Sequence, residues 1–247
     1  MLFIWFSFGP DSLGLRASIA SARRFASSPG DAFVVAEEEG NPIVPTIRAE
    51  LAGQGVLFLR RPPARNLNGS RAAVVSIADT MLVAMNQTRQ ETVWKIDSDT
   101  LVFSRAWRHL LELCLCDLVG GDHVMRPGAA ALGMAYMIRR VALLNARALL
   151  LERADFSAIA WPEDVAITSS ALEAGARVNL RPAGEWIAWS YSAEATPEKY
   201  GSFDVVSFGN RALIPGPPDM VDQDRRRIAG EAMADCLAWR LARARPA

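Results

Sequence analysis

A regular alternation of short apolar runs with longer segments of helical period is the feature that most constrains how this chain can fold. The apolar runs have the length of β-strands and lie at residues 2–8, 32–36, 55–59 and 92–97. Apolar side chains at the spacing of an amphipathic helix lie between them, at residues 13–25, 45–53 and 70–86. Strands and helices in this order predict an α/β fold with a mostly parallel central sheet flanked by helices.

Composition narrows the class of protein. The chain has 247 residues, 51% of them apolar, which is enough for one large α/β domain or two small ones with a proper core. Its 27 basic and 27 acidic residues cancel, so the net charge gives no argument for nucleic acid as a partner. Three cysteines are too few for a disulfide framework, and we expect a reducing, cytoplasmic location.

The most informative motif is the end of the fourth apolar run, Lys95-Ile96-Asp97-Ser98-Asp99. Two carboxylates in one turn after a buried strand suit a hard divalent cation such as Mn²⁺ or Mg²⁺, which prefers oxygen ligands and keeps several waters. Oxygens of a bound diphosphate would complete the coordination shell, so the substrate would be part of the metal site. The alternative is that Asp97 and Asp99 only cap and solvate a turn.

Beyond Asp99 the pattern predicts more helix than strand. We expect helices near 104–115 and over 135–151, with a Gly-rich loop from Gly120 to His123 between them. Two later strands and a terminal amphipathic helix are predicted at residues 178–180, 186–191 and 222–243.

A further helix is predicted to begin at Trp161-Pro162-Glu163-Asp164. Proline is tolerated in the first turn of a helix, and the helix dipole favours acidic residues there. Glu163 and Asp164 can therefore be an acidic cap of the helix, or they can carry chemistry.

Taken in order, these features resemble a glycosyltransferase of the GT-A type. The resemblance covers residues 2–190 and depends on the Asp-x-Asp motif and on the Glu163-Asp164 pair. It implies a UDP-sugar or another nucleotide-sugar as donor, a hydroxyl of a glycan or other molecule as acceptor, and Mn²⁺ or Mg²⁺ as cofactor. It also implies one catalytic domain over residues 1–247, with a nucleotide-binding half at about 1–103 and an acceptor-binding half at about 104–247.

The resemblance assigns roles to the two acidic motifs. Asp99 would ligate the metal, while Asp97 would read the ribose and share the metal through water. Asp164 matches the general base of inverting members, which takes the proton of the acceptor hydroxyl. Glu163 would orient the acceptor or replace Asp164 as the base.

The donor-binding positions that the resemblance implies are Phe8, Gly9, Pro10, Glu37, Asn68, Arg71, Lys95, Asp97 and Ser98. Phe8-Gly9-Pro10 and Glu37 follow the first two strands, where they would contact the nucleobase. Asn68 precedes a glycine at a helix start, which would let the backbone approach the diphosphate. Arg71 and Lys95 are the cationic candidates for the diphosphate, with a solvated side chain as the alternative for each.

The sequence departs from the family at one position. Many members take a third metal ligand from a histidine near the end of the domain, and this chain has no histidine after His123. Asp204, Ser207 and Asn210 lie about where that histidine would fall. Either one of them or a water replaces it, or the metal dependence is weak. We expect His109 to be structural, whereas His123 could line the acceptor side.

Other interpretations stay open. A haloacid-dehalogenase-like phosphatase also has an Asp-x-Asp motif, but its motif usually lies on an early strand and no threonine follows it directly. Here the motif ends the fourth strand, and Thr100 follows it directly. A nucleotidyltransferase would carry basic residues in the loop after its first strand, where residues 9–14 have none. A non-catalytic domain would bind a sugar or partner without turnover.

The arginines of the terminal helix would allow a peripheral membrane contact, although we expect its apolar face to pack on the core.

Overall fold

The structure, a computed structural model, describes residues 1–7, 12–62, 70–113, 116–122, 128, 130–153, 163–182, 187–188, 203–208 and 222–244. Several residues singled out in the sequence lie outside these ranges, namely Phe8, Gly9, Pro10, Asn68, His123 and Asn210. Their assigned roles stay predictions.

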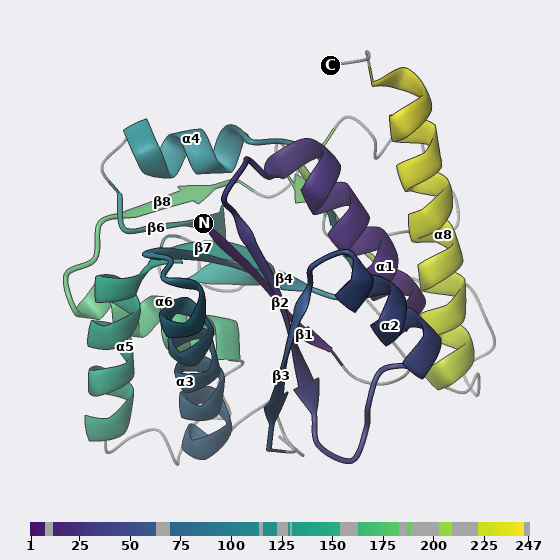
Figure 1. Cartoon of the computed structure of the whole chain (residues 1–247). Helices are drawn as coiled ribbons and strands as arrows, with labels where there is room; N and C mark the ends of the chain where they lie inside the picture. The colour runs from purple at the N-terminus through teal and green to yellow at the C-terminus, as the bar shows by residue number, and fades with distance from the viewer. Residues whose placement is uncertain are drawn as a thin grey trace.

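Seven strands form the central sheet in the order β3-β2-β1-β4-β7-β6-β8 (Figure 1). In that order the strands are Leu57–Arg61, Ala32–Glu38, Leu2–Ser7, Thr92–Asp97, Ala131–Arg139, Leu118–Asp122 and Val178–Arg181. Neighbours are parallel except at β7, which runs antiparallel to both β4 and β6. The predicted mostly parallel sheet is therefore confirmed. A smaller sheet has the order β5-β10-β9, with bounds Thr100–Val102, Val205–Ser207 and Ile187–Ala188.

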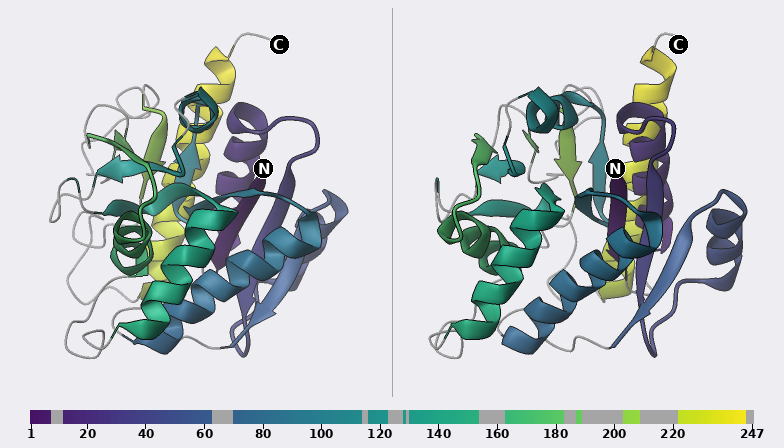
Figure 2. Two further views of the ribbon diagram at one scale, coloured as in Figure 1. Left: turned by 90° about the vertical axis from the view of Figure 1, so that its left-hand side faces the viewer. Right: turned by 60° about the vertical axis from the view of Figure 1, so that its left-hand side comes forward.

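Helices cover both faces of the central sheet (Figures 1 and 2). One face packs against α3 (Arg71–Thr88), α5 (Arg140–Glu152) and α6 (Glu163–Glu173). The other packs against α1 (Ser12–Ser21), η2 (Ala22–Ala26), α2 (Pro45–Gly53) and α4 (Ala106–Leu113). Because both faces are covered, every residue of β1 is buried, which is why its sequence is apolar without alternation.

The last helix, α8 (Asp222–Arg243), packs on α1 and the small sheet (Figure 1). Its buried residues include Met233 and Leu237, so part of its apolar face packs on the core as expected, whereas Leu241 near its end is 44% exposed. Within the described ranges, no helix is long and apolar enough to cross a membrane. The peripheral membrane contact considered for this helix stays a prediction.

Two predictions of local structure were wrong. The helix predicted over 135–151 begins only at Arg140, because residues 131–139 form β7 between β4 and β6. The predicted loop at Gly120 is part of β6. Both strands are buried on both faces, so their small and apolar residues do not alternate with polar ones and give no strand period.

The parallel strands bring their carboxyl ends to one edge of the sheet. Ser7 is opposite Glu37, Phe6 is opposite Asp97, and Glu38 is opposite Arg61. The described carboxyl ends of β1, β2, β3 and β4 therefore lie side by side. In sheets of this kind the carboxyl edge is where ligands bind.

Candidate functional site

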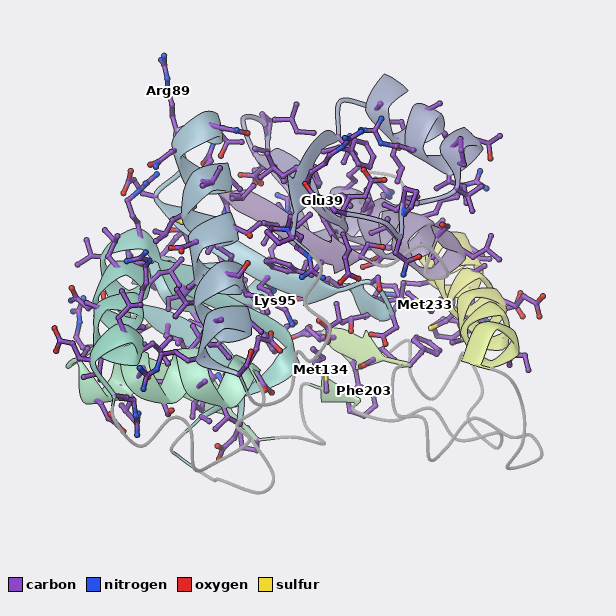
Figure 3. All side chains as sticks on the ribbon, turned by 90° about the horizontal axis from the view of Figure 1, so that it is seen from below. Glu39, Arg89, Lys95, Met134, Phe203 and Met233 are labelled. Atoms are coloured by element: carbon purple, nitrogen blue, oxygen red, sulfur yellow. The ribbon has the colours of Figure 1, made fainter. Side chains whose placement is uncertain are left out.

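Lys95 is the centre of a charged cluster at this edge. Its side chain is 4% exposed, and its Nζ donates hydrogen bonds to Asp97 Oδ1 at 2.5 Å and to the Gly133 carbonyl oxygen at 2.6 Å. Glu163 Oε1 forms an ion pair with the same nitrogen at 2.9 Å. Figure 3 shows Lys95 inside the molecule, whereas Arg89 projects outward from the end of α3. One ammonium therefore joins β4, β7 and the start of α6.

The neighbouring carboxylates keep Lys95 charged although it is buried. Burial alone would lower the pKa of Lys95, but Asp97 and Glu163 more than offset this and raise it well above its ordinary value. Burial raises the pKa of Glu163, and the nearby Lys95 ammonium opposes that rise. Of the three side chains only Asp97 is substantially exposed, at 40% against 16% for Glu163, so Asp97 is the one that a bound ligand can reach most directly.

Asp164 lies beside this cluster in the first turn of α6, as predicted for the helix start. Its carboxylate is buried and accepts hydrogen bonds from the backbone N–H groups of Val165 and Gly133. Burial raises the pKa of Asp164, although Lys95 and these hydrogen bonds oppose the rise. Thr168 connects the same turn to β7, because its Oγ1 donates to the Asp164 carbonyl oxygen and accepts from the N–H of Ala131.

Gly133 is the residue that allows β7 and α6 to approach. A Cβ atom at this position would lie 2.6 Å from Asp164 Oδ2 and 2.7 Å from its Cγ, which is closer than real contacts allow. The same residue offers its carbonyl oxygen to Lys95 and its N–H to Asp164. Gly133 thus lies between the two charged groups and fixes the distance between them.

The cluster continues across the sheet to β3. Burial lowers the pKa of Arg61, while Glu38 and Glu163 oppose the shift, which places this guanidinium in the field of both carboxylates. Its Cζ lies 5.6 Å from the centre of the Phe6 ring. Tyr136 is also fully buried here, and burial together with Glu163 raises its pKa well above the ordinary value. Its hydroxyl has no hydrogen-bond partner among the described residues.

Neutral hydrogen bonds hold the Asp-x-Asp turn from the opposite face of the sheet. The Ser18 hydroxyl of α1 donates to the Thr100 carbonyl oxygen and accepts from Trp5 Nε1 at 2.8 Å. Ser21 accepts from the Val102 N–H at 3.0 Å, one turn further along α1. The chain after Asp97 therefore has a fixed path.

The small sheet brings the segment of the missing histidine next to Asp99. Ser207 is opposite Thr100, and the Phe208 N–H donates to the Asp99 carbonyl oxygen at 2.9 Å. Asp204 lies at the other end of β10, where Ser104 donates to its carboxylate, and burial raises its pKa. Of the two described candidates for a third ligand, Ser207 is therefore the one near the Asp-x-Asp turn.

Asp97 and Asp99 fit a divalent cation as two hard oxygen donors in one turn. The described residues contain no group of three carboxylate, histidine or cysteine side chains that would hold a metal without a substrate. A Mg²⁺ or Mn²⁺ ion that keeps waters and takes diphosphate oxygens needs only one or two carboxylates from the protein. The donor set thus suits an ion that arrives with a nucleotide.

The structure gives less evidence on the other predicted donor-binding residues. Glu37 is buried against α2, where its carboxylate accepts from the Ile43 N–H at 3.1 Å and from Arg48 Nε at 3.2 Å. Arg71 is the first residue of α3, whose N-cap Ser70 accepts from the Ala73 N–H. Ser98 is buried in the turn next to Gly14 of α1. Their contacts with a donor stay predictions.

Sequence reasoning missed three members of the cluster, Gly133, Tyr136 and Arg61. Gly133 and Tyr136 lie on β7, which was predicted as loop and helix, so the sequence pattern did not predict that they lie next to Lys95. Arg61 follows the strand predicted at residues 55–59 and ends β3 in the structure. It could have been found, because a charged residue just after a strand's carboxyl end is a candidate for a site. The link from Lys95 to Glu163 requires a contact between segments far apart in the chain.

The fold has clear counterparts among solved structures. The chain resembles galactosyltransferase LgtC in complex with donor and acceptor sugar analogues, with a TM-score of 0.56 and 12% identity over 94% of this chain and 95% of that one. It resembles the apo structure of the bifunctional glycosyltransferase WbbM, with a TM-score of 0.57 and 13% identity over 98% of this chain but only 50% of that one. For mouse xyloside xylosyltransferase 1 the TM-score is 0.50 and the identity 11%, over 87% and 99% of the two chains.

No protein-family model and no curated protein matches the sequence. Identities this low establish the fold alone. The predicted GT-A-like architecture, a mostly parallel sheet between helices, is confirmed.

Proposed function

We propose that this protein transfers a sugar from a nucleotide-diphosphate donor, a UDP-sugar, to an acceptor hydroxyl with the help of a divalent cation. The observation that carries the proposal is the cluster around Lys95. It joins the Asp-x-Asp turn to the acidic start of α6, at the edge of the sheet where this fold binds ligands. The likeness to solved glycosyltransferases supports the same class of reaction.

The nucleotide-binding half, at about residues 1–103, supplies the groups that would hold the donor. Asp99, with Asp97 as its partner, would hold Mn²⁺ or Mg²⁺ against the diphosphate. A cation there neutralises the negative charge that builds up on the departing diphosphate. Ser18 and the small sheet hold the backbone of the turn in place, which favours a fixed orientation of Asp99.

The acceptor-binding half, at about residues 104–247, supplies the base. The acceptor oxygen attacks the anomeric carbon, the bond to the diphosphate breaks, and the hydroxyl proton passes to Asp164. A buried carboxylate with a raised pKa is a stronger base than an exposed one, and the N–H groups of Gly133 and Val165 fix its orientation. Direct displacement from the side opposite the diphosphate inverts the anomeric centre.

A thermal-shift panel tests this proposal. Purified protein is melted with nucleotides and nucleotide-sugars, each with Mn²⁺ and with EDTA. Because a ligand that binds only the folded state stabilises it, UDP at about 100 times its Kd should raise the melting temperature by about 5–10 °C with Mn²⁺. The shift should be smaller with EDTA.

The best donor in the panel is then followed by proton NMR for hydrolysis and for transfer to simple sugars. Inversion predicts a first product of the opposite anomeric configuration. If neither a nucleotide nor a nucleotide-sugar stabilises the protein with Mn²⁺, the donor assignment is wrong. If all bind but none is ever consumed, the non-catalytic interpretation replaces the transferase.

A further inference from the structure

The Lys95 ammonium is surrounded by oxygens of the protein, because it donates hydrogen bonds to Asp97 and Gly133 and forms an ion pair with Glu163. A lysine ammonium has three donors, and three oxygens lie within 2.9 Å of Nζ, from Asp97, Gly133 and Glu163. A diphosphate that approached Lys95 would compete with these contacts. The contacts thus favour a role for Lys95 inside the protein over the role of diphosphate ligand.

The partners of Lys95 belong to different sides of the proposed reaction. Asp97 is part of the turn that would hold the cation and the donor, whereas Glu163 begins the helix that carries the proposed base. Gly133 connects to the base directly, through its hydrogen bond to Asp164. Lys95 is the described side chain that contacts all three.

We propose that Lys95 is a positioning residue that couples the Asp-x-Asp turn to the first turn of α6. This inference rests on the proposed function. The coupling arises because Asp97 and Glu163 compete for the one ammonium of Lys95. A divalent cation that takes Asp97 releases Lys95 to pair fully with Glu163. Conversely, a Lys95 that is held by Glu163 competes less with the cation for Asp97.

The charges around Lys95 support this exchange. Among the described residues, the carboxylates of Glu38, Asp97, Glu163 and Asp164 lie near the cations Lys95 and Arg61. Asp97 is the more exposed of the two carboxylates that contact Lys95, so it is the one that can turn to solvent without leaving a buried charge unpaired.

This competition predicts the direction in which a change at Glu163 alters the affinity for the cation. Replacing Glu163 by glutamine removes one partner of Lys95, so the ammonium holds Asp97 more tightly and the cation binds less well. Glu163→Gln should therefore weaken Mn²⁺ binding although Glu163 ligates no metal. Coupling between sites is typically on the order of 5–150-fold, and we expect the lower end for one shared ammonium.

The test is calorimetric titration of Mn²⁺, alone and with saturating UDP, into four proteins: wild type, Glu163→Gln, Lys95→Met and the double variant. Glu163→Gln should weaken Mn²⁺ affinity by about fivefold in the wild-type background. It should have less than a twofold effect in the Lys95→Met background, because no ammonium remains to compete. Glu173→Gln is the matched control, an equal change at the other end of α6 that removes its ion pair with Arg153. Equal affinities in wild type and Glu163→Gln, or an equal loss in both backgrounds, would overturn the coupling.

A double-mutant cycle of unfolding free energies, measured without ligand, separates this inference from the proposed function. In urea unfolding, Glu163→Gln should cost more stability with Lys95 present than with Lys95→Met, because it then weakens the compensation of a buried ammonium. Arg61 still faces Glu163 in both backgrounds. Lys95→Gln serves in place of Lys95→Met if the latter does not fold. Equal costs in both backgrounds overturn the coupling, whereas a correct cycle with no UDP binding in wild type overturns only the donor assignment.

Discussion

The two sides of the turn from Asp97 to Thr100 are held by different chemistry. On the α6 side, a buried ammonium contacts carboxylates from two elements. On the α1 side, Ser18 and its neighbours hold the same turn through neutral hydrogen bonds. Neutral bonds suffice to fix a backbone, so the charged side requires another explanation.

The difference in free energy between neutral hydrogen bonds and buried ion pairs indicates this explanation. A neutral buried hydrogen bond contributes about 0.5–1.5 kcal/mol, whereas burying an ion pair costs desolvation that its attraction often fails to recover. Charged clusters with raised pKa values gather at functional sites more often than elsewhere. The α1 side therefore sets the geometry of the turn, and the α6 side is where the chemistry is expected.

Asp164→Asn should have the largest effect on the charged side. It removes the proton acceptor but keeps the size of the side chain, so transfer should fall on the order of 10²–10⁴-fold, with little change in nucleotide affinity. The measurement is the turnover of the best donor per folded molecule. If Glu163→Gln is the inactive variant instead, the base is Glu163, and unchanged turnover in both would leave the charged side without a base.

The pH profile gives a second measure of the same group. The base must be ionised to act, so kcat/KM should rise with pH through the pKa of Asp164. Because burial raises that pKa, the rise should fall above the ordinary value for aspartate of about 3.9. The rise should be absent in the residual activity of Asp164→Asn. A profile that is flat from pH 4 upward would contradict the assignment.

Gly133→Ala tests how closely β7 and α6 must approach. The added Cβ would overlap the Asp164 carboxylate, so we expect a loss of about 1–3 kcal/mol in the free energy of unfolding and a loss of transfer. Gly53→Ala is the matched control, because Gly53 ends α2 with nothing within 4 Å of the added atom. Equal stability of the two variants in urea would show that the cluster is looser than described.

Ser18→Ala tests the neutral side. The change leaves Trp5 Nε1 and the Thr100 carbonyl oxygen without their partner, which should cost about 1–3 kcal/mol of stability. Ser27→Ala removes a single partly buried bond, to the Arg23 carbonyl oxygen, and should cost less. Both are measured by urea unfolding. A larger loss for Ser27→Ala would mean that Ser18 does not hold the turn.

Tyr136→Phe should have the smallest effect. Its hydroxyl is buried without a hydrogen-bond partner among the described residues, so removing it should change stability by less than about 1 kcal/mol, and in the favourable direction. Thermal melting of the two proteins side by side measures this. A clear loss of stability would reveal a partner, such as a buried water, within the charged cluster.

The sequence was sufficient where strand length and helix caps determine local structure. The apolar run ending at Asp97 and the acidic start of α6 were predicted correctly because each depends on neighbouring residues alone. The terminal helix was placed at residues 222–243 for the same reason.

The rest depends on contacts between distant segments. β7 was missed because a strand buried on both faces has no polar alternation, and its Ala and Gly residues fit a helix equally well. Without β7, neither Gly133 nor Tyr136 could be placed beside Lys95. For the same reason the ion pair of Lys95 with Glu163 was not predicted, since nothing local indicates that Glu163 lies next to it. The role of Lys95 as a diphosphate ligand stays a prediction.

The most direct test of the central claim is the binding of UDP to wild type and to Asp99→Ala, with Mn²⁺ and with EDTA. Asp79→Ala is the matched control, a surface aspartate of α3 paired with Arg147 on α5. If the Asp-x-Asp turn holds a cation against the diphosphate, Mn²⁺ should raise UDP affinity in wild type and Asp79→Ala. In Asp99→Ala that gain should fall by at least about tenfold while the protein stays folded. Undiminished Mn²⁺-dependent binding in folded Asp99→Ala would contradict the account.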